Sequence, residues 1–578
     1  MLLVFVVAGV LFFAGLGHFP LFEPDEGRNA EVAREMIELD DWITPHYNGL
    51  TYLDKPALFF WMVATSFKAL GFTAAAARLP SALMALGTVF LAWLWARRVG
   101  VGRVNTALIL ASTPFMIAFS RIVIFDMTLT FLVSLSLLGF WGLEKSEFQK
   151  VRFSLLFFGS MGLAAITKGP VGFLLPLLTV IAYLGLSGRW RDLGRLRWGP
   201  GLLAFLATAL PWFLAASLQN PDFPRYAFLD ESLLRFTTGS ARRGGPLYYY
   251  LPVFLLGFLP WSLFLLTGYL GRWREWRRLR DPENRALLFV VCWAAVVLVF
   301  FTISRSKLPG YILPAFTPLS LLAARLWDRW PGAEGGAPPP RWLTRGFWAL
   351  LGLGLLIFLS SWGLQLGLGP SQERLIEKMG PRVASELSPT LFFWGIMLVG
   401  ISVLGRHASW RRHGPGVTLA LLVLAVPLVI VRGYRPLRAH LAAQSSEELA
   451  EKILSSEMAE SPLYAYHCYR PSLGFYLGRP VNLVTSDASE LGSNYISPRV
   501  KQFLNEPGTT IFSPEHLVRV AEANSRRVLV LTLNANLSSL IDTIPRAEPL
   551  WQDWKYSVWV IPPANPAQAA GSDAPPDN

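Results

Sequence analysis

Two short charged motifs stand out in a chain that is otherwise strongly apolar. The first, Glu23-Pro-Asp-Glu-Gly-Arg28, follows directly after an apolar segment at the N-terminus. The second, Tyr52-Leu-Asp-Lys-Pro56, comes shortly afterwards. A carboxylate beside a bilayer is costly and is usually kept for a function. Together the two motifs offer acids that can act as a base and cations that can hold a phosphate.

The composition is that of an integral membrane protein. Of the 578 residues, 53% are hydrophobic and 16% are charged, with a mean hydropathy of +0.40. Soluble domains carry about 25% charged residues, so the repeated apolar runs predict a polytopic membrane protein. The net charge of +13 is spread over short loops, which fits membrane topology better than nucleic-acid binding. Cys292 lies in an apolar run and Cys468 in the C-terminal region, so no disulfide is expected between them.

The apolar runs predict thirteen transmembrane segments, each near the length that crosses about 30 Å of hydrocarbon. Residues 1–17 have neither a basic start nor a cleavage site, so we expect an uncleaved first span rather than a signal peptide. With the N-terminus in the cytoplasm, all arginine-rich loops fall on the cytoplasmic side, as the positive-inside rule requires. The segments are expected near 2–18, 80–96, 104–120, 127–143, 153–167, 171–187, 200–217, 248–270, 286–303, 311–327, 346–364, 389–404 and 416–431.

One apolar stretch, 57–71, does not fit this alternation. If it crossed the membrane, every later arginine cluster would face outward. We therefore expect it to lie in the outer interface as a juxtamembrane helix. The first outer loop, 22–79, then contains two interfacial helices, at 25–39 and 58–70.

The C-terminal region, 432–563, has the pattern of a small soluble α/β domain. A capped helix is expected at 445–453, and four short apolar runs are expected as strands. The tail at 564–578 is rich in Ala, Pro and Asp and is expected to be disordered. The predicted architecture is therefore an α-helical polytopic membrane protein, with a transmembrane domain at 1–431 and a small α/β domain outside. The expected strands are 463–467, 481–484, 527–533 and 558–561.

Several cations break the positive-inside rule because they lie on the outer side, often next to Pro or Gly at a span end. Snorkelling to lipid headgroups can explain any single one of them. As a set in short motifs, they can bind a pyrophosphate or phosphodiester at the membrane surface. For Asp25 the alternative to catalysis is a helix N-terminal charge, worth roughly 0.3–1 kcal/mol. The outer cations are Arg28, Arg34, Lys55, Arg78, Arg121, Lys168, Arg225, Arg235, Arg242, Arg243, Arg305 and Lys307.

Two further outer segments carry groups suited to the same chemistry. Asp126 opens a predicted span, but its distance of five positions from Arg121 does not place both on one helical face. Either the loop bends there, or the two side chains contact different partners. In the loop 219–247, Arg242-Arg243-Gly-Gly precedes a tyrosine run, which suits either a phosphate-contacting lid or an interfacial aromatic belt.

As a set, the outer-loop motifs resemble a known family. They look like those of the bacterial polyprenyl-phosphate-dependent glycosyltransferases of the GT-C superfamily. That superfamily includes the protein O-mannosyltransferases (PMT family) and the ArnT-like transferases of 4-amino-4-deoxy-L-arabinose to lipid A. The resemblance spans about residues 20–320. The matching motifs are Pro24–Arg28, Glu31–Met36, Trp42–Pro45, Asn48–Leu50, Asp54–Pro56, Ala77–Pro80, Arg121–Asp126, Thr167–Pro170 and Ser306–Pro314.

The resemblance implies an enzyme of the bacterial inner membrane, with a cytoplasmic N-terminus and a periplasmic C-terminal domain. It implies transfer of a sugar from undecaprenyl phosphate to an outer-face acceptor, with an aminoarabinose-type transfer to lipid A as the favoured case. Mannose transfer to protein, or transfer to another lipopolysaccharide or cell-wall glycan, stays open. A transporter or flippase for a lipid-linked anion is the non-enzyme alternative. The charges gather at span ends and no internal repeat is visible, which favours the transferase.

The resemblance also implies roles for particular residues. Asp25 is the expected base or acceptor-orienting group of an inverting displacement, with Glu26 and Asp126 as further catalytic acids. Asp54 falls where some relatives are linked to a divalent metal, but this chain has Arg242-Arg243 where relatives often carry His. No other cofactor and no nucleic-acid partner are expected, and the donor is a polyprenyl-phosphate-linked sugar. The expected ligands of the lipid phosphate and substrate are Arg28, Tyr52, Lys55, Arg121, Lys168, Arg242, Arg243, Lys307 and Tyr311.

Overall fold

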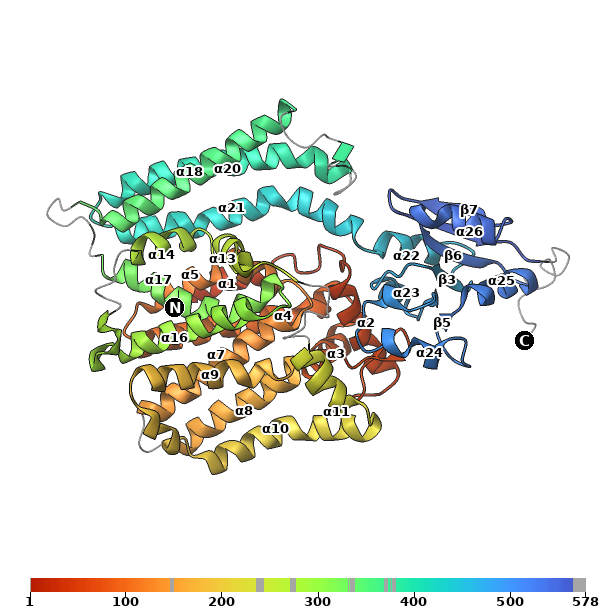
Figure 1. Cartoon of the computed structure of the whole chain (residues 1–578). Coiled ribbons are helices and arrows are strands. Elements are labelled where there is room, and N and C mark those ends of the chain that lie inside the picture. Colours follow the sequence, from red (N-terminus) through yellow and green to blue (C-terminus); the bar gives the residue numbers. More distant parts are fainter. Residues whose placement is uncertain are drawn as a thin grey trace. The chain divides into compact units, whose positions relative to one another are not determined.

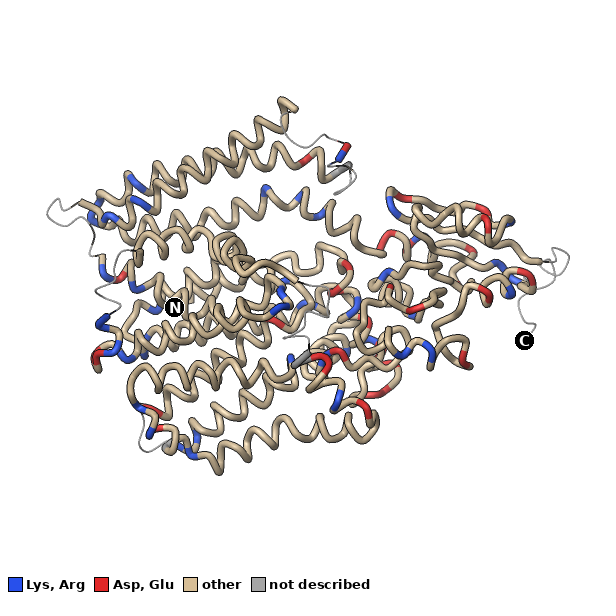
Figure 2. The backbone as a smooth tube through the Cα atoms, viewed as in Figure 1, with Lys and Arg blue, Asp and Glu red and all other residues tan. Residues whose placement is uncertain are grey.

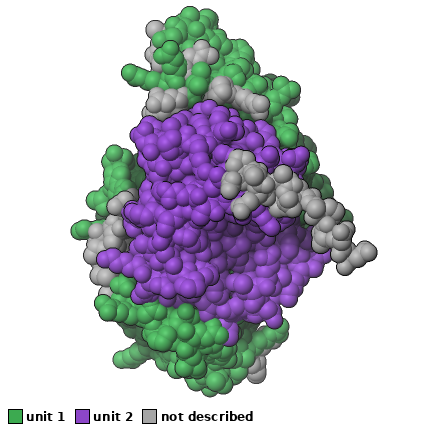
Figure 3. Space-filling view, turned by 90° about the vertical axis from the view of Figure 1, so that its right-hand side faces the viewer, with its two compact units in different colours: residues 1–18, 56–66, 73–440 green, residues 19–55, 67–72, 441–578 purple. Residues whose placement is uncertain are grey.

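The protein divides into two compact units. Unit 1 comprises residues 1–18, 56–66 and 73–440, and unit 2 comprises 19–55, 67–72 and the chain from 441 onward (Figure 3). Most of the first outer loop therefore folds together with the C-terminal region. The computed structural model describes residues 2–145, 150–234, 244–270, 277–330, 332, 338–367, 373–374, 376 and 381–564.

Unit 1 is a bundle of apolar α-helices, as expected for a chain that must satisfy every backbone polar group inside lipid (Figure 1). Within the described residues, eight helices are long and apolar enough to cross a membrane, or nine if one bent pair counts as a span. The predicted multi-span helical architecture is thus confirmed. The eight helices are α4 (Ala74–Arg98), α7 (Phe125–Lys145), α8 (Lys150–Lys168), α10 (Trp198–Gln219), α16 (Arg285–Ile303), α18 (Arg341–Gln365), α20 (Pro381–Ser409) and α21 (Gly414–Ala443).

The remaining predicted spans are short or broken helices. The segment predicted as a span at 248–270 is not one straight helix, because two helices there meet at an angle of 114°. Pro260 stands at the break, where it cannot donate a backbone N–H to a continuing helix. Pro114 divides the span predicted at 104–120 in a similar way. These elements are α1 (Leu2–Phe13), α5 (Arg103–Ala111), α6 (Pro114–Ser120), α9 (Val171–Leu186), α13 (Tyr250–Gly257), α14 (Trp261–Tyr269), η6 (Pro309–Ala315) and α17 (Phe316–Asp328).

Aromatic side chains fill the centre of unit 1. The Trp95 ring of α4 stacks on Phe289 of α16 with ring centroids 5.5 Å apart, and Trp141 of α7 lies 5.3 Å from the same ring. Tyr183 of α9 meets Phe289 edge-on at 5.2 Å. Lipid tails are as apolar as these side chains, so close packing rather than burial from water holds such helices together.

Lys and Arg residues gather at one end of the unit 1 helices, as Figure 2 shows. The positions of the arginine-rich loops, which follow every second span in the sequence, predict this clustering. The charge distribution therefore gives the bundle a basic end.

Unit 2 contains a six-stranded mixed sheet in the order β5-β4-β3-β6-β8-β7. Strands β5, β4, β3 and β6 are parallel, and β8 and β7 continue the sheet in antiparallel pairing. The predicted C-terminal helix appears as α22 (Glu447–Leu454), and the four predicted strands appear as β3, β4, β6 and β8. The strands are β3 (Leu463–Tyr466), β4 (Asn482–Val484), β5 (Ile511–Phe512), β6 (Val528–Leu533), β7 (Glu548–Gln552) and β8 (Tyr556–Ile561), and further helices are α23 (Leu473–Leu477), α25 (Pro514–Ala523) and α26 (Leu537–Thr543).

The first outer loop supplies α2 (Asp25–Glu38), a hairpin of β1 (His46–Tyr47) and β2 (Leu50–Thr51), and α3 (Leu58–Leu70). Both predicted helices are therefore present. At 13 residues, α3 is about 20 Å long, too short to cross about 30 Å of hydrocarbon. Every side chain of α2 from Glu26 to Met36 is buried, so this helix is packed inside the protein rather than lying on a surface.

Candidate active site

The first motif opens helix α2, and its two opposite charges lie in different surroundings. Asp25 forms an ion pair with Arg28 one turn further on, and the Asp25 side chain keeps 32% of its surface exposed. Arg28 is buried and also donates to the carbonyl of Gly492 at 3.5 Å. Burial disfavours its charge, but Tyr52, Asp25 and other neighbours outweigh this, and the pKa of Arg28 lies above its ordinary value. Asp25 is therefore an accessible carboxylate oriented by a buried cation.

Glu26, predicted as a second catalytic acid, is fully buried. Its carboxylate accepts the backbone N–H of Phe22 at 3.3 Å, just ahead of the helix start. A carboxylate at a helix N-terminus stabilises the unpaired N–H groups there. This contact gives Glu26 a structural reason to be acidic and leaves Asp25 as the accessible acid of the motif.

The second motif follows the β1–β2 hairpin. The two carboxylate oxygens of Asp54 accept the backbone N–H groups of Tyr495 at 2.8 Å and Asn494 at 3.1 Å. Lys55 is half-buried, and its Nζ donates to the backbone carbonyl of Asp54 at 2.7 Å. Tyr52 is buried and meets the Tyr47 ring edge-on at 5.6 Å. The structure thus gathers Asp25, Arg28, Tyr52, Asp54 and Lys55 in unit 2.

The surroundings of Asp54 do not fit a metal ligand set. Both of its oxygens accept backbone N–H groups, and the buried Arg28 cation lies close enough to interact with it. Within the part of the chain that the structure describes, no group of three His, Cys, Asp or Glu is placed to hold a metal ion. Arg242 and Arg243, at the position where relatives often carry His, lie outside the described residues. No catalytic step is therefore routed through a metal at Asp54.

Unit 1 carries a second group, built from Asp126, Lys168 and Tyr311. Asp126 lies in the first turn of α7 and Lys168 in the last turn of α8, with 2.6 Å between Oδ1 and Nζ. Their side chains are only 5% and 12% exposed. The Lys168 Nζ also lies 4.5 Å from the centre of the Tyr311 ring of η6. A buried ion pair is favourable only with good geometry and further contacts. Both are present here, so the three side chains form a specifically arranged group.

Two other predicted phosphate ligands are engaged with helix ends in unit 1. Arg121 donates to the backbone carbonyls of Leu11 at 3.1 Å and Ala14 at 2.6 Å, near the end of α1. Arg121 and Asp126 therefore contact different partners. Lys307 is buried, and its Nζ donates to three carbonyls at the end of α16, the shortest contact being 2.6 Å to Ser304. Cations commonly satisfy the last carbonyls of a helix, so both side chains have a structural explanation.

A buried acidic cluster on α2 is missing from the sequence predictions. Glu31 accepts two hydrogen bonds from Arg34, at 2.7 and 2.8 Å, and Arg34 also pairs with Glu38. Glu35 accepts the N–H of Gly49 at 2.9 Å, while its Oε1 has no hydrogen-bond partner among the described residues. The signal was present in the sequence, because charges three and four positions apart share one helical face. Burial of that face is what the sequence does not reveal.

Glu35 gives unit 2 a pH-dependent stability. Burial, together with the nearby Glu31 carboxylate, raises the pKa of Glu35 from 4.5 to about 8. The contribution of Glu35 to stability is therefore fully present below pH 4.5 and is lost as the pH rises from there through about 8. Within that window we expect the wild type to lose about 1.4 kcal/mol per pH unit relative to Glu35→Gln, which cannot ionise. The apparent thermal midpoint of the purified protein, measured from pH 5 to 8.5, checks this.

The matched control for this experiment is Glu38→Gln, one turn along the same helix. The Glu38 side chain is 43% exposed, so its removal should shift the midpoint by a similar small amount at every pH. Parallel curves for wild type and Glu35→Gln would show that Glu35 titrates normally in the folded protein.

Comparison with known proteins places this geometry in context. The sequence model of the dolichyl-phosphate-mannose-protein mannosyltransferase family matches residues 1–227. An undecaprenyl phosphate-alpha-4-amino-4-deoxy-L-arabinose arabinosyl transferase of Pseudomonas aeruginosa (strain LESB58) is 30% identical over 493 residues, covering 82% of this chain and 84% of that enzyme. The enzyme of the same name from Yersinia enterocolitica is 30% identical over 436 residues, covering 72% of this chain and 74% of that enzyme. The crystal structure of ArnT from Cupriavidus metallidurans bound to undecaprenyl phosphate superposes with a TM-score of 0.82 at 26% identity, covering 98% of each chain.

Proposed function

This chain belongs to the GT-C family of undecaprenyl phosphate-aminoarabinose arabinosyl transferases, and from that premise we propose that it transfers aminoarabinose from undecaprenyl phosphate to lipid A. It is a multi-span membrane glycosyltransferase with a polyprenyl-phosphate-linked sugar donor. The observation that carries the finer proposal is the likeness, over 98% of the chain, to an enzyme structure that holds undecaprenyl phosphate. The two charged motifs of the first outer loop supply the matching chemistry.

The proposed reaction is a single displacement at the anomeric carbon of the sugar. An acceptor oxygen forms a bond to that carbon while the bond to the undecaprenyl phosphate oxygen breaks, which inverts the anomeric centre. Asp25, the accessible carboxylate of α2, takes the proton of the acceptor. Lys55 and Arg28 stabilise the phosphate monoester as its charge develops, so no covalent intermediate on the protein is required.

The group in unit 1 is assigned a supporting role in this proposal. Lys168 is paired with Asp126, with 2.6 Å between Nζ and Oδ1, so in this proposal it supports the site and Lys55 is the ligand of the lipid phosphate. The ion pair joins α7 to α8, and the contact of Lys168 with the Tyr311 ring joins them to η6. We assign Asp126 the task of holding Lys168 and Tyr311 in the orientation that the substrate meets.

We also propose the orientation of the protein in the bacterial inner membrane. The basic end of the unit 1 bundle (Figure 2) would face the cytoplasm, because translocation disfavours short loops rich in Lys and Arg. The N-terminus would then be cytoplasmic and the C-terminal region periplasmic, on the side where lipid A is modified.

The test is the mass of lipid A from cells that lack their own aminoarabinose transferase and express this protein or its Asp25→Asn variant. A pentosamine-sized addition that appears with the wild type and disappears with the variant supports the proposal. Glycoproteins from the same cells are measured in parallel, because residues 1–227 also match the sequence model of a protein mannosyltransferase family. Unchanged lipid A with an altered glycoprotein or glycan would reject lipid A as the acceptor.

A further inference from the structure

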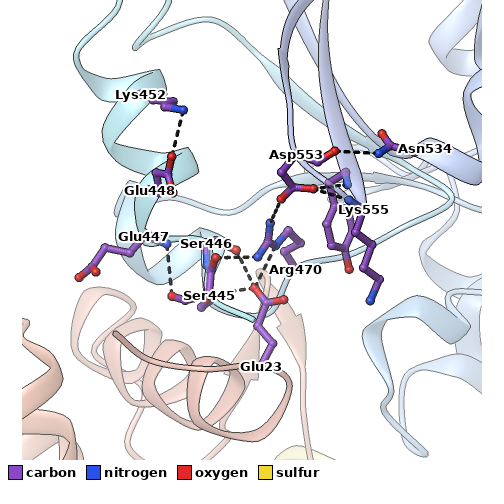
Figure 4. Close-up of polar contacts among 12 residues, drawn as sticks. Glu23, Ser445, Ser446, Glu447, Glu448, Lys452, Arg470, Asn534, Asp553 and Lys555 are labelled. Carbon is purple, nitrogen blue, oxygen red and sulfur yellow. Dashed lines mark hydrogen bonds and ion pairs between the residues drawn. The ribbon is translucent and has the colours of Figure 1, made fainter. Parts of the chain in front are cut away.

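Within unit 2, the first outer loop is held by the C-terminal region, and one of the contacts lies two residues from Asp25. The Oε1 of Glu23 accepts hydrogen bonds from Ser446 Oγ at 2.6 Å and from Ser472 Oγ at 2.7 Å. Arg470 approaches the same oxygen at 3.4 Å and lies 2% exposed, so the Glu23 carboxylate has a buried counter-ion (Figure 4). A charge-assisted network of this kind is costly to disrupt because each member is left unpaired.

A second contact explains the glycine of the first motif. A Cβ atom on Gly27 would lie 2.5 Å from the backbone nitrogen of Ser472, closer than any real side chain allows. A Cβ on Gly474 of α23 would lie 2.6 Å from a carboxylate oxygen of Glu31. Helices α2 and α23 therefore approach each other backbone to backbone, which fixes the position of α2 closely.

The third set of contacts joins the C-terminal region to the hairpin and to the second motif. Asn48 in the hairpin turn exchanges two hydrogen bonds with the backbone of Val481, at 2.8 and 2.9 Å, in the manner of a paired strand. Asp54 accepts the two consecutive N–H groups of Asn494 and Tyr495. Lys55 is bonded through its Nζ to the carbonyl of that same Asp54. The position of Lys55 is thus tied to the loop that follows β4.

These contacts fall where an α/β sheet ordinarily binds a ligand. Ser472 and Arg470 lie just after β3, and residues 492–495 lie after β4, at the carboxyl ends of parallel strands. Strand β3 has β4 on one side and β6 on the other, so the strand order reverses there. Open α/β sheets bind ligands outside the carboxyl ends of strands at such a reversal. Here a segment of the chain itself takes that place.

We propose that the C-terminal region, 441–564, positions the phosphate-binding motif of the first outer loop, and that Asp54 is a positioning residue that acts through Lys55. This inference rests on the proposed function, because it takes undecaprenyl phosphate as the ligand of Lys55. It differs from a role of the region in selecting the acceptor and from a role of Asp54 as a metal ligand.

The test measures binding of undecaprenyl phosphate itself to the purified full-length protein in detergent. Four variants are compared with wild type: Asp54→Ala, Asp54→Asn, Lys55→Ala and the double variant Asp54→Ala/Lys55→Ala. We expect Asp54→Ala to weaken binding about tenfold, and Asp54→Asn to weaken it less, because asparagine keeps one of the two acceptor oxygens. The double variant should bind no more weakly than Lys55→Ala, since a residue that acts through Lys55 has no effect once Lys55 is gone.

The matched control is Glu448→Gln on α22 of the same region. Glu448 is 73% exposed and pairs only with the exposed Lys452 in Figure 4, so binding should not change. Variants are compared only where size-exclusion profiles match wild type, and Asp54→Asn keeps the test open if Asp54→Ala does not fold.

Three results with the variants would overturn the inference. Additive losses in the double variant would show that Asp54 acts independently of Lys55. Unchanged undecaprenyl phosphate binding with a raised KM for the acceptor would assign the region to acceptor selection. A difference between wild type and Asp54→Ala that vanishes in EDTA and returns with Zn²⁺ would make Asp54 a metal ligand.

Wild type that binds undecaprenyl phosphate but forms no aminoarabinose product would refute only the proposed function. Wild type that does not bind undecaprenyl phosphate would refute both the proposed function and the inference.

Discussion

Replacing Asp25 by Asn is expected to lower the initial rate of sugar transfer by about 10²–10⁴-fold, the range for loss of a general base. The substitution keeps the shape of the side chain and its place in the first turn of α2, but removes the charge that pairs with Arg28. Rates are measured with purified protein, an undecaprenyl-phosphate-linked aminoarabinose donor and lipid A. Because the carboxylate is proposed to act on the acceptor, donor KM should change far less than kcat.

The matched control for that substitution is Asp40→Asn, just beyond the end of the same helix. Asp40 has a φ of 49°, a conformation that asparagine adopts readily, and its carboxylate accepts an exposed hydrogen bond from Trp42 Nε1 at 3.1 Å. The transfer rate of the Asp40→Asn variant should stay within about twofold of wild type. An Asp25→Asn enzyme that retains most of its rate would remove Asp25 from the catalytic machinery and leave it as a helix N-terminal charge.

Asp126→Asn is expected to cost both stability and activity. The change leaves Lys168, whose side chain is only 12% exposed, without its counter-ion, and breaking a pair that is mostly buried costs about 3–5 kcal/mol. The apparent thermal midpoint should fall by several degrees, and the transfer rate should fall as Lys168 and Tyr311 lose their orientation. Heating followed by size-exclusion chromatography measures the first effect, and initial rates measure the second.

The double variant Asp126→Asn/Lys168→Gln separates these two effects. It removes both charges, so the midpoint should return toward the wild-type value, whereas the rate should stay low. The control is Glu386→Gln, which breaks a partly exposed pair with Arg432 between α20 and α21 and should change the free energy of unfolding by no more than about 1 kcal/mol. Recovery of the transfer rate in the double variant would show that Asp126 and Lys168 serve only the packing of α7 against α8.

Local patterns in the sequence were sufficient to predict the architecture. Apolar runs identify membrane helices because hydropathy acts over single segments, and the helices at 25–38 and 58–70 were predicted within one residue. The helix after 445 and four strands of the C-terminal sheet also follow from local signals. The family resemblance rests on the same kind of evidence, since each motif is a short continuous string. The bend at Pro260 was missed because hydropathy does not register the direction of a helix.

The sequence by itself therefore determined the class of protein, the order of its membrane helices and of four strands, and the motifs that carry the chemistry. Only the tertiary structure decided which charges meet. Lys168 and Asp126 are separated by 42 positions, Tyr495 and Asp54 by 441, and Arg470 and Glu23 by 447. The physical reason is that such pairs form through the packing of distant segments, which also buries α2 and raises the pKa of Glu35. Composition and spacing along the chain carry no record of that burial.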